Sequence, residues 1–229
     1  MLTYLLFMAP AIILALWAQM RVKSTFGRFA EVPTRGGLSG SDVARMILRA
    51  RGLTDVQVER TSGFLSDHYD PAHKTLRLSE ATYDSTSVAA VGVAAHEAGH
   101  ALQHADGYAA LNFRSAVVPV VSLGSRMLPF LILAAILTGA FGRGGLLAWL
   151  AVAALGLIAF FSVITLPVEF NASSRALAVL SSGGILVGEE LTGARQVLSA
   201  AALTYVAAAI SATLQMVYWV LLLLGGGDD

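Results

Sequence analysis

The chain has 229 residues, of which 56% are hydrophobic and only 13% are charged. A soluble globular domain carries about 25% charged residues, and a disordered chain is far less hydrophobic, so this composition excludes both classes. The 15 basic and 15 acidic residues cancel, which leaves no cationic surface of the kind that binds nucleic acid. Because there is no cysteine, disulfides, thiolate nucleophiles and cysteine-ligated metals are excluded as well.

Four apolar runs are each long enough to cross a membrane, which takes about 20 mostly apolar residues. The first has no basic residue before it and no small-residue cleavage site after it, so we interpret it as a retained span rather than a signal peptide. The turn at residues 142–145 is so short that it predicts an antiparallel pair of helices on its two sides. The four predicted spans are residues 1–20, 116–141, 146–166 and 203–224.

The polar residues gather between the first and second spans. Residues 21–115 contain eleven of the 15 basic residues, ten of the 15 acidic residues and all five histidines. Arg21, Lys23 and Arg28 directly follow the first span, and basic residues at a span's end mark the cytoplasmic side. The sequence therefore predicts a multi-pass membrane protein with residues 21–115 and 167–202 in the cytoplasm and both termini outside.

The polar segment has the pattern of a small α+β domain. A helix is predicted over residues 43–51, with Ser39, Ser41 or Asp42 as its cap. Residues 56–60 alternate as a strand does, and a hairpin is predicted from two strands that flank the turn at residues 70–73. An alanine-rich helix, capped by Asp84 or Ser85, then runs to His104. The predicted fold class is a membrane α-helical protein with four transmembrane helices and this small domain inserted between the first and second.

The alanine-rich helix contains the motif His-Glu-x-x-His, at His96, Glu97 and His100. Residues i and i+4 share one face of a helix, so the two imidazoles can bind one metal ion about 2 Å away. Glu97 lies on the adjacent face, where it can act as general base toward a metal-bound water. Flanking residues are apolar, and a buried His-Glu-His cluster without a metal would be costly. The motif therefore predicts a catalytic Zn²⁺ in a zincin-like domain.

A catalytic zinc needs a third protein ligand, and three residues are candidates. His104 is one turn beyond His100, but ligands at i, i+4 and i+8 of one straight helix do not converge on one ion. Asp106 follows at the spacing of a longer zinc motif that requires glycine where this chain has Gln103. Glu169 follows the third span on the same predicted side of the membrane as the motif. A lone glutamate placed there favours Glu169 as the ligand, although an interfacial carboxylate paired with Arg175 is the alternative.

Several stretches resemble a known family over nearly the whole chain. In these stretches the chain resembles the YugP-type family of neutral zinc metallopeptidases of bacterial membranes. It resembles more distantly the HtpX-like membrane proteases, in which a downstream glutamate on a helix is the third zinc ligand. The stretches that carry the resemblance are Leu65–Pro71 with Leu76–Ser79, Val91–Gln103, Pro167–Phe170 and Ala202–Ala208.

The resemblance implies a zinc metallopeptidase of the gluzincin type in a bacterial plasma membrane. It implies His96, His100 and Glu169 as zinc ligands and Glu97 as the base. The chain departs from the HtpX-like pattern at Ser173, where an aspartate would orient a zinc-binding histidine.

The first hypothesis for the function is a membrane-embedded zinc endopeptidase, with Glu97 moving the proton from the attacking water to the leaving amine. Arg175, Tyr205 and His68 are candidate donors to the oxyanion. The predicted hairpin offers an edge strand that can bind extended substrate. The rival hypothesis is a non-catalytic membrane scaffold with a structural zinc, but structural sites usually have four protein ligands and three good ones are visible.

The spacing also predicts where such an enzyme would work. Glu169 lies three residues after Leu166, a distance of at most about 10 Å even in an extended chain. Ala116 begins the second span 16 residues after His100. The zinc is therefore expected close to the lipid bilayer, with membrane-associated or juxtamembrane protein segments as substrates.

Overall fold

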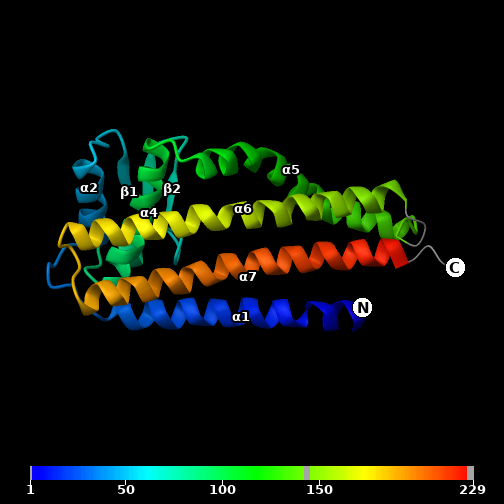
Figure 1. The fold of residues 1–229 in the computed structure, drawn as a ribbon, viewed down its shortest axis with the longest axis horizontal. Coiled ribbons are helices and arrows are strands. Elements are labelled where there is room, and N and C mark those ends of the chain that lie inside the picture. The colour runs from blue at the N-terminus through cyan, green and yellow to red at the C-terminus, as the bar shows by residue number, and fades with distance from the viewer. Residues whose placement is uncertain (1, 142–144, 226–229) are drawn as a thin grey trace. The chain divides into compact units, whose positions relative to one another are not determined.

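The structure is a computed structural model that describes residues 2–141 and 145–225. The predicted turn at residues 142–145 therefore falls largely outside the described residues. Figure 1 follows the helices and strands along the chain.

Within the described residues, four long helices are apolar enough to cross a membrane, judged by their length and composition. Three of them extend beyond the spans predicted for them. The second begins earlier than predicted, at Ala109 rather than residue 116, and it ends at Leu137, so the predicted end at residue 141 was wrong. The third, α6 (Leu146–Ser182), continues past Leu166 without interruption at Pro167. It continues because Ala172, Ala176 and Leu180 form a buried stripe at helical spacing. The four helices are α1 (Leu2–Ala30), α5 (Ala109–Leu137), α6 (Leu146–Ser182) and α7 (Glu189–Gly225).

The chain forms two compact units. Of the described residues, one unit contains 2–18, 113–141, 145–166 and 204–225, and the other contains 19–112 and 167–203. The predicted segment 21–115 thus lies in the second unit up to residue 112, and residues 167–203 complete that unit. Every residue of the predicted zinc site belongs to this second unit, which we call the polar unit.

Several small side chains are buried where the helices of the first unit meet. Ala135, Ala148 and Val152 are buried there with Leu223. Such close packing of small residues is typical of helices in a membrane, where apolar lipid removes the hydrophobic drive between helices.

Three short strands of the polar unit form one sheet in the order β1-β3-β2. The central strand β3 (Thr75–Ser79) runs parallel to β1 (Gln57–Thr61) and antiparallel to β2 (His68–Asp70). The structure confirms the predicted hairpin, whose turn is held by Asp70 Oδ1 accepting from the amides of Ala72 and His73. Leu76 and Leu78 of β3 are fully buried against the core.

Two helices pack against this sheet and each other, α2 (Gly40–Ala50) and α4 (Val88–Ala105), with the single turn α3 (Glu80–Tyr83) before α4. Ser39 caps α2, as one of the predicted alternatives, in a reciprocal pair of bonds with Asp42.

The predicted cap of α4 was wrong. Ser87 caps it, since its hydroxyl accepts from the amide of Ala90 at 3.2 Å. Ser85 instead donates to Ser87, and Asp84 pairs with Arg60. Because the separate short helix α3 ends at Tyr83 and α4 begins only at Val88, the cap lies later in the chain than the sequence spacing indicated.

Candidate metal centre

The motif helix α4 lies in the core of the polar unit. Its small side chains, among them Ala94, Ala95 and Ala98, are fully buried, so neighbouring elements approach the helix closely. The spacing of His96 and His100 places both imidazoles on one face, with ring centroids 4.8 Å apart. Their side chains are 13% and 11% exposed, so each ring is nearly enclosed and still reachable from outside.

That face of α4 is turned toward α6. Gly99 makes the close approach possible, because a Cβ at this position would lie 2.6 Å from the carbonyl oxygen of Ala172. Any side chain larger than hydrogen would push the two helices apart. The approach brings Glu169 of α6, which is 3% exposed, to the two histidines.

The three side chains converge on one point. Glu169 Oε2 lies 3.3 Å from His96 Nε2 and 3.5 Å from His100 Nε2. All three ligand atoms lie within 4.8 Å of one another. Ligands about 2.05 Å from a tetrahedral zinc are separated by about 3.3 Å, so these spacings fit a zinc ion. Two imidazoles and one carboxylate also leave the fourth position open, as catalytic zinc sites do.

Glu97 is buried beside this group, with 8% of its surface exposed. Burial raises the pKa of its carboxyl, and the charges of His96 and His100 oppose that rise. A carboxyl with a raised pKa holds a proton more readily than an exposed glutamate does.

The second nitrogen of each histidine is also held. Ser173 Oγ lies 3.0 Å from His96 Nδ1, and Gln103 Oε1 lies 2.9 Å from His100 Nδ1. Ser173 therefore contacts a histidine of the motif through a hydroxyl, at the position where the HtpX-like pattern has an aspartate. Contacts of this kind fix which nitrogen faces a metal.

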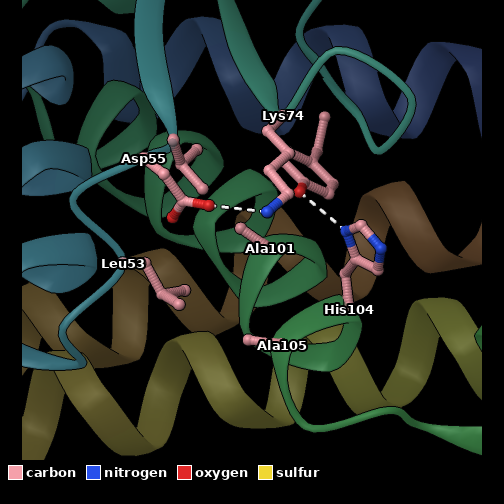
Figure 2. Close-up of a pocket in the computed structure, with 8 residues that line it drawn as sticks. Leu53, Asp55, Lys74, Ala101, His104 and Ala105 are labelled. Carbon is pink, nitrogen blue, oxygen red and sulfur yellow. Dashed lines mark hydrogen bonds and ion pairs between the residues drawn. The ribbon is translucent and has the colours of Figure 1, made fainter.

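The other two ligand candidates are engaged elsewhere. His104 Nδ1 is hydrogen-bonded to the Tyr69 hydroxyl at 2.9 Å. His104 lines a pocket of about 300 Å³ that none of His96, His100 and Glu169 lines. Figure 2 shows His104 there together with Leu53, Ala101 and Ala105. Asp106 is ion-paired with Arg175 and with Arg51, and these pairs lower the pKa of its carboxyl.

Of the predicted oxyanion donors, Arg175 donates to Asn171 Oδ1 at 2.8 Å and also contacts Asp106. His68 contacts the carbonyl of Ser66 and the guanidinium of Arg77. Tyr205 belongs to the other compact unit, and its role stays a prediction.

Sequence reasoning missed three residues that build this centre: Gly99, Gln103 and Asn171. Gln103 is fully buried and donates to the carbonyl of Val168 at 2.8 Å and to Asn171 Oδ1 at 2.9 Å. Its position one turn after His100 was the available signal, since residues i and i+3 are neighbours on a helix. Its partners on α6 could not be found in this way.

Comparisons with known proteins agree with this chemistry. A family model described as "Putative neutral zinc metallopeptidase" matches residues 4–224. The chain is 46% identical over 216 residues to the protein of Bacillus subtilis (strain 168) named "Putative membrane protease YugP", and the matched region covers 94% of each chain. No solved structure matches the chain.

Proposed function

This chain belongs to the family described as "Putative neutral zinc metallopeptidase", and from that premise we propose that it is a membrane zinc endopeptidase. His96, His100 and Glu169 hold the zinc ion, and Glu97 acts as the base. Its substrates are membrane-associated or juxtamembrane protein segments. The active site faces the cytoplasm of a bacterial cell.

One observation carries the proposal, namely the convergence of two imidazoles and one carboxylate from two helices. Glu169 is 73 residues from His96 in the chain, and yet their ligand atoms are 3.3 Å apart. Bringing a buried carboxylate to two buried imidazoles costs desolvation that a bound cation offsets. Three ligands with a fourth position open favour a catalytic zinc over a structural one.

The chain's own residues supply the proton transfers. A zinc ion bound here supplies Lewis acidity toward water and toward a peptide carbonyl. Glu97 accepts a proton from the attacking water at a carboxylate oxygen and delivers it to the nitrogen of the leaving amine. The raised pKa of its carboxyl suits this role, because the group must hold the proton between the two steps.

Two features support the choice of substrate. Strand β2 is an edge strand of the sheet and packs against the motif helix α4, and an extended segment can bind to an edge strand by main-chain pairing. Glu169 follows Leu166 on the same continuous helix, which is a rise of about 4.5 Å at 1.5 Å per residue. The carboxylate ligand is thus tied closely to an apolar span.

The test is proteolysis by the purified protein in liposomes, with zinc content measured in the same samples. We expect Glu97→Gln to retain one zinc per chain and to lose activity by at least about 100-fold, since general acid–base catalysis contributes about that much. A scaffold with a structural zinc would show no zinc-dependent cleavage in either protein.

The same experiment addresses the substrate class when one flexible sequence is offered both free and joined to a transmembrane anchor. The proposal predicts faster cleavage of the anchored form. Equal rates at matched local concentration would contradict the preference for membrane-associated substrates and leave the peptidase assignment intact.

A further inference from the structure

A chain of hydrogen bonds leads from His100 to the surface of the polar unit. His100 contacts Gln103, the amide of Gln103 contacts Asn171, and Asn171 contacts Arg175. Arg175 in turn contacts Asp106, which ends α4 as its C-cap. The network thus leaves α4 at Gln103, passes along α6 and returns to the end of α4.

The guanidinium of Arg175 determines which group donates and which accepts in the other hydrogen bonds of the network. A guanidinium can only donate, so the Asn171 atom that faces Arg175 must be the carbonyl oxygen. That same oxygen faces Gln103 at 2.9 Å, so Gln103 must present its NH2 group there. The NH2 group also donates to the carbonyl of Val168, which requires the same orientation of the amide.

The remaining atom of the Gln103 amide is then an acceptor. It is an oxygen 2.9 Å from His100 Nδ1, and an oxygen acceptor requires a proton on that nitrogen. In a neutral imidazole a proton on Nδ1 leaves the lone pair on Nε2. Nε2 is the atom of His100 that faces Glu169.

We propose that Arg175, acting through Asn171 and Gln103, fixes the His100 tautomer that offers Nε2 to the metal. The three are positioning residues of the zinc centre. Arg175 on this account does not donate to an oxyanion, because Asp106 and Asn171 hold its guanidinium. The inference rests on the proposed function, since it concerns the zinc that the centre would hold.

The burial of Gln103 and its bond to the carbonyl of Val168 make the network rigid. Gln103 is fully buried, so an amide turned the wrong way would leave buried polar atoms without partners. The amide also joins the ring of His100 on α4 to the peptide group that precedes Glu169 on α6. One side chain therefore sets the separation of two ligands that come from different helices.

The test measures zinc affinity by competition with a chelator, on purified full-length variants. We expect Gln103→Met and Asn171→Leu to weaken zinc binding by about 10-fold to 100-fold, the usual effect of removing a partner of a metal-binding histidine. Asn171→Asp should bind zinc at least as tightly as the unmodified protein, because both network bonds to Asn171 end on Oδ1, which aspartate retains.

Arg175→Met and Arg51→Met form a matched pair. Both arginines contact Asp106, but the network bond to Asn171 comes from Arg175. We expect weaker zinc binding for Arg175→Met and unchanged binding for Arg51→Met. The visible spectrum of the Co²⁺ form should change in Arg175→Met and Asn171→Leu but not in Asn171→Asp, which separates altered ligand geometry from a general loss of stability.

The outcomes distinguish this inference from the function on which it rests. If the unmodified protein binds zinc and Asn171→Leu binds it equally well with an unchanged Co²⁺ spectrum, the inference is wrong and the peptidase proposal stands. If Asn171→Asp loses zinc as Asn171→Leu does, the bonds to Oδ1 do not carry the effect and the inference is again wrong. Absence of zinc binding by the unmodified protein would contradict the proposed function itself.

Discussion

At the scale of single residues, the two histidines of the motif differ in how their hydrogen-bond partners define the position of the ring proton. His96 Nδ1 contacts the hydroxyl of Ser173, which can donate or accept, whereas His100 Nδ1 contacts an amide oxygen whose direction is determined by its other partners. We expect the orientation of His100 to be the better defined of the two.

The choice between Glu169 and Asp106 as third ligand also belongs to this scale. We predict that Glu169→Ala abolishes stoichiometric zinc binding, because two imidazoles without a third protein ligand bind zinc weakly. Asp106→Ala should retain one zinc per chain, because the Asp106 carboxylate is engaged by two arginines. Metal analysis of the purified variants checks both outcomes. An empty site in Asp106→Ala together with a full one in Glu169→Ala would show that the ligand assignment is wrong.

At the scale of elements, the centre depends on the contact between α4 and α6. Gly99 lies against the backbone of Ala172 on α6, and both histidines of the motif lie near it on α4. The glycine is needed for space alone, because its backbone is that of an ordinary helix.

We predict that Gly99→Ala destabilises the protein by about 1–3 kcal/mol, the usual cost of overpacking, and weakens zinc binding. Its Cβ would lie 2.6 Å from the Ala172 carbonyl oxygen, which is backbone and cannot turn aside. The measurement is thermal unfolding in detergent, with and without zinc.

Gly92→Ala is the matched control on the same helix. Its Cβ would meet the Cβ of Ala194 at 3.4 Å, an ordinary contact. Alanine favours a helix over glycine by up to about 1 kcal/mol, so this variant should be as stable as the unmodified protein or slightly more so. Similar losses in both variants would contradict the importance of the contact at Gly99.

At the scale of the whole molecule, the four apolar helices and the basic residues after the first span predict the topology. Because the chain has no cysteine, single cysteines can report it. We predict that Lys74→Cys is not labelled by a membrane-impermeant reagent in intact cells and is labelled after the cells are permeabilised. Leu146→Cys, near the predicted outer turn, should be labelled in intact cells.

Lys74 suits the experiment because its side chain is 54% exposed and lies in the polar unit. Burial within the protein therefore does not explain a failure to react. Labelling of Lys74→Cys in intact cells would overturn the cytoplasmic placement of the polar unit.

Much of this protein could be predicted from local patterns in the sequence. Helical spans follow from apolar runs, the hairpin follows from alternation around Asp70, and the shared face of His96 and His100 follows from the helical period. Each of these depends on residues a few positions apart, where backbone geometry sets the distance. The choice of Glu169 needed more, namely the count of membrane crossings and the resemblance to a family.

The tertiary structure alone decided how α4 and α6 meet. Three contacts join residues that are 35 to 69 positions apart in the chain. They are the hydrogen bonds of Gln103 with Asn171, of His104 with Tyr69 and of Asp106 with Arg175. Such pairs depend on how elements pack on one another, and the packing of α4 on α6 requires a residue without a Cβ at Gly99. A sequence pattern carries the period of each helix separately, but not the depth at which two helices come into contact.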